Sequence, residues 1–201
     1  MGITDFSITL LNKVIEEYRP KSVCEMGDQN LYTGDNNYGK YANLYYEQKG
    51  IEEYACIDIN GGNNAFDFDM SYPIDDNFAK YEPYDLVTDF GFSEHVGRDG
   101  KFDWEAIYNC WQNKHNLLKI GGIMVNENPL EKNWPLHGFN FYGWDFYTEL
   151  AELSGYEILE QGIHPAMGNI TDGYNLYSIL KKNSVKFPSL SEFKTLPLKQ
   201  S

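Results

Sequence analysis

Carboxylates stand at the ends of successive short apolar stretches of the 201-residue chain. Glu25 and Gly27 close the first stretch, where a glycine lets the backbone approach a nucleotide-like ligand and an acid can accept a hydrogen bond from an ammonium group. Asp58 ends the second stretch, and its carboxylate can accept hydrogen bonds from both hydroxyls of a ribose. Asp69 and Met70 follow the third. This order predicts one ligand site assembled at adjacent strand ends.

The same residues also have purely structural interpretations. Asp58 precedes Asn60 in a turn-rich stretch, where an aspartate commonly caps a turn. Gly27 can serve a simple strand-ending turn. Asp67 competes with Asp69 for the end of the third stretch, so the sequence leaves the choice between them open.

Three further titratable residues are candidates for proton transfer. His137 lies in a loop after the fifth predicted strand, and because imidazole titrates near neutrality it can take a proton from a hydroxyl or an amine. Glu94 and His95 are second candidates. Each also has a simpler interpretation: His137 can cap or pack its loop, Glu94 can pair with a neighbour, and His95 can orient the segment that carries it.

The spacing of apolar residues predicts the elements that position these side chains. Helices are expected over residues 5–19, 38–49, 104–118 and 144–154. Strands are expected over residues 22–26, 54–58, 65–68, 84–89, 123–126, 156–161 and 174–181. Gly121-Gly122 is expected to end the third helix.

Strands that alternate with helices predict an α/β domain with a mainly parallel sheet and helices on both faces. Ligands of such sheets bind at the carboxyl ends of the strands, where the acids above stand. We expect one domain over residues 1–182 and a surface C-terminal tail over residues 183–201, which contain Pro188 and Pro197.

The residues around Gly27 resemble motif I of the class I S-adenosylmethionine-dependent methyltransferases, an acid-x-Gly-x-Gly pattern. Glu25 and Gly27 match this pattern, and Gln29 replaces the second glycine. In this resemblance Asp58 is the ribose-binding acid of motif II. Asp69-Met70 takes the motif III position, where an acid meets the adenine amino group and its neighbour packs on the ring.

The resemblance continues through the second half of the chain. Residues 84–96, "YDLVTDFGFSEHV", resemble motif IV, the strand and loop beside the transferred methyl group, and this assigns Asp89 and Phe90 to the cofactor site. Residues 117–125, "LLKIGGIMV", resemble the helix, turn and strand that follow. The family resemblance implies a Rossmann-like three-layer sandwich with a mostly parallel seven-stranded sheet and a last antiparallel strand. The G-x-G-x-x-G pattern of a dehydrogenase is absent from the sequence.

The resemblance also implies S-adenosylmethionine as cofactor and an enzyme that transfers its methyl group to a small-molecule or saccharide acceptor. Three aromatic residues are candidate walls of the acceptor pocket: Phe90, Phe92 and Phe139. The missing second glycine leaves open a methyltransferase-like binding or assembly module without catalysis, and a nucleotide-binding regulatory domain is a third interpretation. Some related O-methyltransferases hold magnesium with clustered acids and amides, and Asp89, Glu127 and Asn128 stand at the ends of adjacent predicted strands. Most such clusters are solvated, so we predict no metal.

The composition of the chain limits the classes of molecule that we expect it to bind. The formal net charge of −14 disfavours nucleic acids and anionic lipid surfaces, and lysines and arginines form no basic patch along the chain. No apolar run is long enough to span a bilayer, so we expect no membrane partner. The three cysteines form no C-x-x-C pair, which favours a reducing, cytoplasmic location. The sequence leaves the oligomeric state open.

Overall fold

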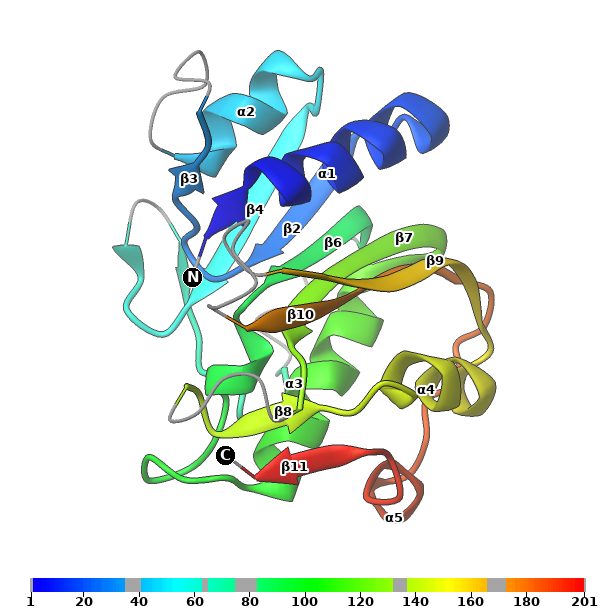
Figure 1. Ribbon diagram of the computed structural model, residues 1–201. Helices are drawn as coiled ribbons and strands as arrows, with labels where there is room; N and C mark the ends of the chain where they lie inside the picture. The colour runs from blue at the N-terminus through cyan, green and yellow to red at the C-terminus, as the bar shows by residue number, and fades with distance from the viewer. Residues whose placement is uncertain are drawn as a thin grey trace.

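Seven strands form one central sheet in the order β5-β4-β2-β6-β7-β10-β9 (Figure 1). The structure is a computed structural model that describes residues 2–34, 41–62, 65–74, 83–131, 137–165 and 173–200. The strands are β2 (Ser22–Met26), β4 (Glu53–Asp58), β5 (Phe66–Asp67), β6 (Tyr84–Phe90), β7 (Leu118–Pro129), β9 (Tyr156–Pro165) and β10 (Tyr174–Lys182). All neighbours pair in parallel except those of β10, which is antiparallel to β7 and β9. The expected mostly parallel sheet with a last antiparallel strand is confirmed.

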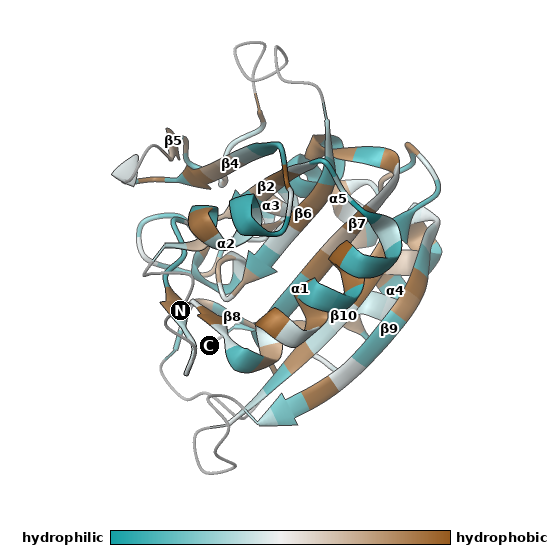
Figure 2. Cartoon of the chain, turned by 90° about the horizontal axis from the view of Figure 1, so that it is seen from above, coloured by the Kyte–Doolittle hydropathy of each residue, from teal (hydrophilic) through white to brown (hydrophobic). Residues whose placement is uncertain are grey.

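Side chains of the sheet alternate between two hydrophobic clusters, one on each face. Val23 and Ile123 belong to one cluster, whereas Met26 and Met124 belong to the other. The first cluster receives α1 (Asp5–Tyr18) and α2 (Ala42–Gln48), and the second receives α3 (Trp104–Leu117) and α4 (Phe146–Ser154). Helices therefore cover both faces of the sheet (Figure 1), and apolar and polar segments alternate along α1 and the strands behind it (Figure 2).

Helix α1 shows how local sequence sets an element's limits. Thr4 and Ser7 form a capping box at its start, and Arg19, with a positive φ of 50°, follows its last residue just before Pro20. The predicted second helix begins at Ala42, and residues 38–40 lie outside the described part of the chain. Among the described residues, no helix has the length and apolar character needed to cross a lipid bilayer.

The prediction that Gly121-Gly122 ends the third helix is wrong. Helix α3 stops at Leu117, strand β7 begins at once, and both glycines lie inside that strand. The pairing with β6 is irregular here, because Tyr84 pairs with Leu118 but Leu86 pairs with Ile123. Gly121 has a φ of +82°, a backbone conformation that favours glycine. The glycine pair therefore allows the irregular strand pairing and does not end a helix.

The C-terminal segment differs from the expected surface tail. It forms α5 (Leu190–Phe193) and β11 (Leu198–Gln200), and β11 pairs with β8 (Asn140–Tyr142). Phe193, Leu196 and Leu198 are buried in the same cluster as α3 and α4. Their apolar side chains make this segment part of the domain's core. At the other end, β1 (Ile3–Thr4) pairs with β3 (Leu31–Tyr32).

Candidate functional site

A pocket of about 500 Å³ opens at the carboxyl ends of β2, β4 and β6. In the sheet, β4 and β5 lie on one side of β2, and β6 and β7 lie on the other. The connection from β2 to β4 and the connection from β5 to β6 therefore run in opposite directions and leave a crevice between them. The lining residues come from the end of β4 and from the segments after β2, β4, β5, β6 and β7: Gly27, Asp28, Gln29, Asp58, Ile59, Asn60, Phe68, Asp69, Met70, Gly91, Phe92, His95, Val96, Gly97, Asp99, Gly100 and Phe139. Of the cofactor residues expected from the sequence, Gly27, Asp58, Asp69 and Met70 line this pocket.

Gly27 forms the turn at the floor of the pocket. Its φ of +81° favours glycine, and its N–H donates to the Ile57 carbonyl at 2.8 Å. Gln29, which replaces the second glycine of the motif, is buried and folds back so that its Nε2 donates to the Met26 carbonyl at 2.9 Å. Its Oε1 is buried and accepts no hydrogen bond from any described residue. A buried acceptor without a partner among the described residues therefore stands beside the Gly27 turn.

Asp58 joins the loops after β2 and β4. Its Oδ2 accepts a hydrogen bond from the Asp28 N–H at 3.1 Å, and its Oδ1 accepts from the Asn60 N–H at 3.0 Å. Asp58 therefore does cap the turn at Asn60, as the structural interpretation predicts. An ionised carboxylate offers about four acceptor positions, so these bonds leave capacity for a ligand hydroxyl on the pocket side.

Asp69 rather than Asp67 faces the pocket. Asp69 lines it and accepts a hydrogen bond from the Ser71 N–H at 2.9 Å, whereas Asp67 is exposed and outside the lining. Met70 is almost fully buried beside it, and Phe68, which the sequence analysis did not select, adds an aromatic face. An acid, a thioether and an aromatic ring therefore lie together at this end of the pocket.

Besides Asp89, two residues expected at the cofactor site do not line the pocket. Glu25 is fully buried and accepts hydrogen bonds from the hydroxyls of Tyr54 at 2.9 Å and Tyr46 at 3.3 Å. Burial raises the pKa of Glu25 to about 8, although the two tyrosine hydroxyls oppose this. Phe90 is buried in the cluster beneath α1. Both side chains hold the sheet around the pocket instead of contacting its interior.

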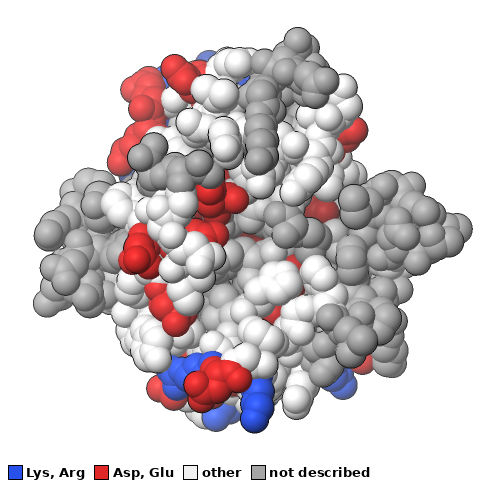
Figure 3. Space-filling model, turned by 90° about the vertical axis from the view of Figure 1, so that its left-hand side faces the viewer, with Lys and Arg blue, Asp and Glu red and all other residues white. Residues whose placement is uncertain are grey.

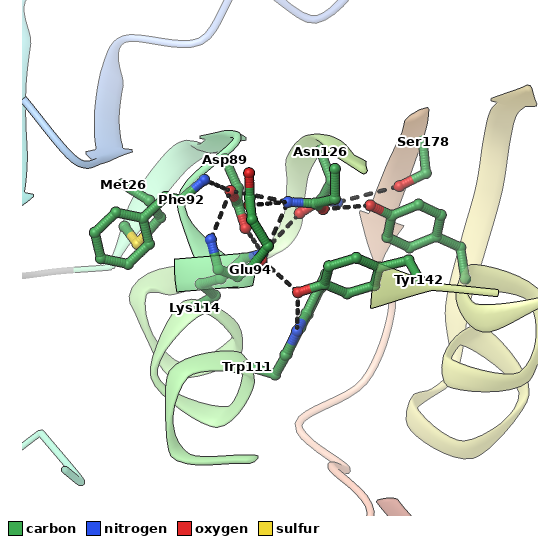
Figure 4. A network of polar contacts seen from close by, with 12 residues as sticks. Met26, Asp89, Phe92, Glu94, Trp111, Lys114, Asn126, Tyr142 and Ser178 are labelled. Carbon is green, nitrogen blue, oxygen red and sulfur yellow. Dashed lines mark hydrogen bonds and ion pairs between the residues drawn. The ribbon is translucent and has the colours of Figure 1, made fainter. Parts of the chain in front are cut away.

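Asp89 also lies beneath the pocket rather than on its wall. Its Oδ2 is 2.6 Å from Lys114 Nζ, and both side chains are fully buried (Figure 4). Burial alone would raise the pKa of Asp89, but the Lys114 ammonium and hydrogen bonds from the next loop hold that pKa below its ordinary value. Oδ1 accepts from the N–H groups of Phe92 and Ser93, so Asp89 fixes the loop that enters the pocket. Lys114 was missed, although a lysine on the apolar stripe of a predicted helix was a usable signal.

A polar network links this ion pair to Glu94 (Figure 4). Asn128 Nδ2 contacts Asp89 Oδ1 at 3.3 Å, Ser93 Oγ at 3.1 Å and Glu94 Oε2 at 3.3 Å. Tyr147 donates its hydroxyl to Asn128 Oδ1 at 2.5 Å. Every member is buried, so the network is rigid and sets where Glu94 lies.

The group Asp89, Glu127 and Asn128 does not assemble as a metal site. Glu127 lies between two asparagines along β7, so its side chain points to the opposite face of the sheet from theirs. Its carboxylate accepts from Ser7 Oγ at 2.7 Å and Asn175 Nδ2 at 2.8 Å, and it contacts His164 Nε2 at 2.9 Å.

Glu94, His95 and His137, all predicted from the sequence, come together beside the pocket, which His95 lines. Glu94 Oε1 is 3.7 Å from His95 Nε2 and 3.6 Å from His137 Nε2. His95 lines the pocket, and burial is the main reason why its pKa is lowered. The loop of His137 is held against Glu94 by the Phe139 N–H, which donates to the Glu94 carbonyl at 2.7 Å.

Phe92 and Phe139 line the pocket beside this cluster, as expected, whereas Phe90 does not. The pocket thus has two groups of lining side chains: Asp58, Asp69 and Met70 from the end of β4 and the segment after β5, and Phe92, His95 and Phe139 from the segments after β6 and β7. The Gly27 turn lies against the Phe92 ring, which would be 3.1 Å from a Cβ at Gly27.

No family model matches the chain, and no curated protein sequence matches it. Solved structures do. The chain is similar to 1,6-didemethyltoxoflavin-N1-methyltransferase from Burkholderia thailandensis with bound 1,6-didemethyltoxoflavin and S-adenosylhomocysteine (13% identity, TM-score 0.57, covering 85% of this chain and 75% of that one). It is also similar to the N-methyltransferase NodS from Bradyrhizobium japonicum WM9 in complex with S-adenosylhomocysteine (14% identity, TM-score 0.58, covering 92% and 89%). A third is an O-methyltransferase family protein from Burkholderia thailandensis (13% identity, TM-score 0.54, covering 89% and 57%). These similarities confirm the Rossmann-like methyltransferase fold that the sequence resemblance implied.

Proposed function

We propose that this chain is an S-adenosylmethionine-dependent methyltransferase that acts on a small-molecule or saccharide acceptor. The observation that carries the proposal is the convergence of Gly27, Asp58 and Asp69-Met70 on one pocket at the point where the strand order diverges. Two of the structures with the same fold contain S-adenosylhomocysteine, the demethylated form of this cofactor.

The described residues fit the cofactor. Gly27 provides a turn that lets the ligand approach the backbone, and the unused Gln29 Oε1 is an acceptor for the ammonium group of its methionine part. Asp58 is the acceptor for the ribose hydroxyls. Asp69 and Met70 are the partners of the adenine amino group and ring. Gln29 thus replaces the second glycine of the motif with a polar contact.

The part of the pocket that Phe92, His95 and Phe139 line is then the acceptor site. Bound S-adenosylmethionine supplies an electrophilic methyl group, so the protein's main task is to hold the acceptor in line with it. Phe92 and Phe139 pack against the acceptor. The candidates for accepting the proton that the acceptor loses are Glu94, His95 and His137.

The charges on the surface and the state of the cysteines support the expected class of acceptor and the expected location. Asp and Glu lie across the middle of the face in Figure 3, and Lys and Arg gather at its lower edge, which favours a small neutral or cationic acceptor over a nucleic acid. Cys24, Cys56 and Cys110 are free and buried, in keeping with a cytoplasmic location.

Calorimetry tests the cofactor assignment. The purified chain is titrated with S-adenosylmethionine, S-adenosylhomocysteine and ATP. We expect the first two to bind at one site and ATP to bind far more weakly. Equal binding of all three would instead identify a general nucleotide-binding domain, and no binding of the first two would contradict the proposal.

The Gln29 side chain also favours a second candidate, a methyltransferase-like binding module without turnover. It stands where the motif has glycine, and its Nε2 lies 2.8 Å from the position that a Cβ on Gly27 would take. Such a module would bind the cofactor and form no S-adenosylhomocysteine with any member of a panel of hydroxyl and amine acceptors. Formation of S-adenosylhomocysteine with one acceptor excludes this candidate.

A further inference from the structure

We propose that Glu94, His95 and His137 bind a divalent transition-metal ion of the zinc type beside the pocket. One ligand atom from each residue, a carboxylate oxygen and two imidazole nitrogens, lies within 4.8 Å of the other two. The metal site is a property of the chain itself, and only its part in catalysis rests on the proposed function.

The buried oxygen of Glu94 is the first reason for this assignment. Glu94 is fully buried, and its Oε1 accepts no hydrogen bond from the described residues. The Nε2 atoms of His137 and His95 lie 3.6 and 3.7 Å from it, beyond hydrogen-bond distance. A buried carboxylate oxygen is costly without a partner. A cation between the three groups would supply that partner.

The spacing suits a metal ion. Zinc with bonds of about 2.0 to 2.2 Å in tetrahedral geometry separates its ligand atoms by roughly 3.4 Å. The two contacts of Glu94 Oε1 exceed this by a few tenths of an ångström, and the two imidazole nitrogens lie within 4.8 Å of each other, so rotation of the side chains would bring the three atoms to one ion.

The backbone and the polar network pre-position two of the ligands. Gly138, next to His137, has a φ of +69°, and a Cβ there would lie 2.8 Å from the Glu94 carbonyl oxygen, so the loop packs directly on Glu94. Asn140 Nδ2 donates to the same carbonyl at 3.2 Å. The second carboxylate oxygen, Oε2, accepts from Asn128. Hydrogen bonds of this kind orient ligating carboxylates in known metal sites.

The donor set indicates the type of ion and its role. Two imidazoles and one carboxylate suit zinc and its first-row neighbours, whereas magnesium and calcium prefer oxygen ligands throughout. Three protein ligands leave one coordination position open, as in catalytic zinc sites. His95 lines the pocket, so an ion bound to it would lie next to the proposed acceptor site.

An ion at this place would make a hydroxyl acceptor more acidic. With the ion bound, the three side chains act as its ligands, so the hydroxyl proton would pass to solvent water instead of to one of them. The acceptor oxygen would form a bond to the methyl carbon, and the carbon–sulfur bond would break with its electron pair remaining on sulfur. The products are a methyl ether and S-adenosylhomocysteine.

The test is direct metal binding by the full chain. After treatment with a chelator and removal of the chelator, the protein is titrated with ZnCl₂ and, separately, with CoCl₂ and MgCl₂. We expect one zinc per chain with a dissociation constant of about 1 µM or tighter. Cobalt should give a visible d–d absorption band that zinc abolishes, and magnesium should not compete.

Variants identify the ligands. Glu94→Gln, His95→Ala and His137→Ala should each weaken zinc binding by roughly a hundredfold or more, beyond the tenfold to hundredfold loss expected for a supporting residue. His164→Gln is the matched control, because it removes another histidine that contacts a buried glutamate, and it should bind zinc like the wild type. His95 is the most exposed ligand, so His95→Ala remains informative if Glu94→Gln fails to fold.

Two results would overturn the proposal: a wild-type chain that binds no zinc, or folded ligand variants that bind zinc as tightly as the wild type. Titration with S-adenosylmethionine in parallel separates this outcome from the proposed function. A chain that binds the cofactor but no zinc refutes the metal site alone, and one that binds zinc but no cofactor refutes the methyltransferase assignment.

Discussion

Lys114 and Asp89 form a buried ion pair directly beneath the pocket, with Nζ 2.6 Å from Oδ2. Lys114 also donates to Asn126 Oδ1 at 2.8 Å and lies over the ring of Trp111, 3.3 Å from its centroid. Asp89 in turn accepts from the N–H groups that open the loop carrying Phe92. The pair therefore connects helix α3 to the loop that forms one wall of the pocket.

Lys114→Met should lower the free energy of unfolding by about 3 to 5 kcal/mol, because it leaves Asp89 as a buried charge without its partner. Urea unfolding measures this. Lys119→Met is the matched control: Lys119 pairs with Asp85 at 2.8 Å, but the two side chains are 42% and 29% exposed. That change should cost no more than about 1 kcal/mol. Equal losses from the two variants would show that the buried pair has no special role.

Glu25→Gln should remove a pH dependence of stability. Burial raises the pKa of Glu25 from 4.5 to about 8, so between these values the folded chain keeps a proton that the unfolded chain releases. This contribution is complete below the lower value and is lost as the pH rises to the upper one. The slope is about 1.4 kcal/mol per pH unit at most.

Urea unfolding of both proteins at steps between about pH 5 and pH 8 tests this difference. The wild type should lose stability relative to Glu25→Gln as the pH rises. Parallel curves for the two proteins would mean that Glu25 is already ionised in the folded chain.

Gly27→Val should abolish or strongly weaken S-adenosylmethionine binding, since a Cβ at Gly27 meets Gln29 Nε2 at 2.8 Å and the Phe92 ring at 3.1 Å. Gly50→Val is the control, because Gly50 has the same left-handed backbone, with a φ of +82°, but open space around its Cβ position. Both variants should lose about 1 to 3 kcal/mol of stability from backbone strain. Calorimetry should find a binding defect in the Gly27 variant alone; equal affinities would argue against close approach of the cofactor there.

The sequence predicts strand limits, turns and strand-end acids correctly where neighbouring residues alone determine them. The apolar stretches that end at Met26 and Asp58 became adjacent parallel strands, and the glycine after β2 took its left-handed turn. Asp58 and Asp69 reached the pocket because the carboxyl ends of parallel strands meet at one edge of a sheet. Asp67 could not be excluded in advance, because only the burial of its neighbours decides which acid faces inward.

The errors arose where distant partners decide the outcome. Glu25 matched its motif, yet Tyr46 and Tyr54 from other elements bury it away from the pocket. Asp89 is likewise held by Lys114, 25 positions away. Phe193 shows the same limit for the C-terminal segment, because nothing local in that segment reveals the core surface against which it packs.

His137→Ala should lower the maximal rate of S-adenosylhomocysteine formation by about a hundredfold to ten-thousandfold. His137 packs against His95, with the ring centroids 4.9 Å apart, and His95 lines the proposed acceptor site, so cofactor affinity should stay within a few-fold of the wild type. His164→Gln should keep both the rate and the affinity. If His137→Ala turns over at the wild-type rate, His137 takes no part in the reaction.

Binding of S-adenosylmethionine to Asp58→Ala, measured by calorimetry beside Asp67→Ala, tests the central claim most directly. The two residues are acids at the carboxyl ends of neighbouring strands, but only Asp58 lines the pocket. Loss of the ribose hydrogen bonds should weaken binding to Asp58→Ala by about 1 to 3 kcal/mol, a factor of roughly 5 to 150, while Asp67→Ala binds like the wild type. Wild-type affinity in the folded Asp58→Ala chain would contradict the assignment of this pocket to the methyl donor.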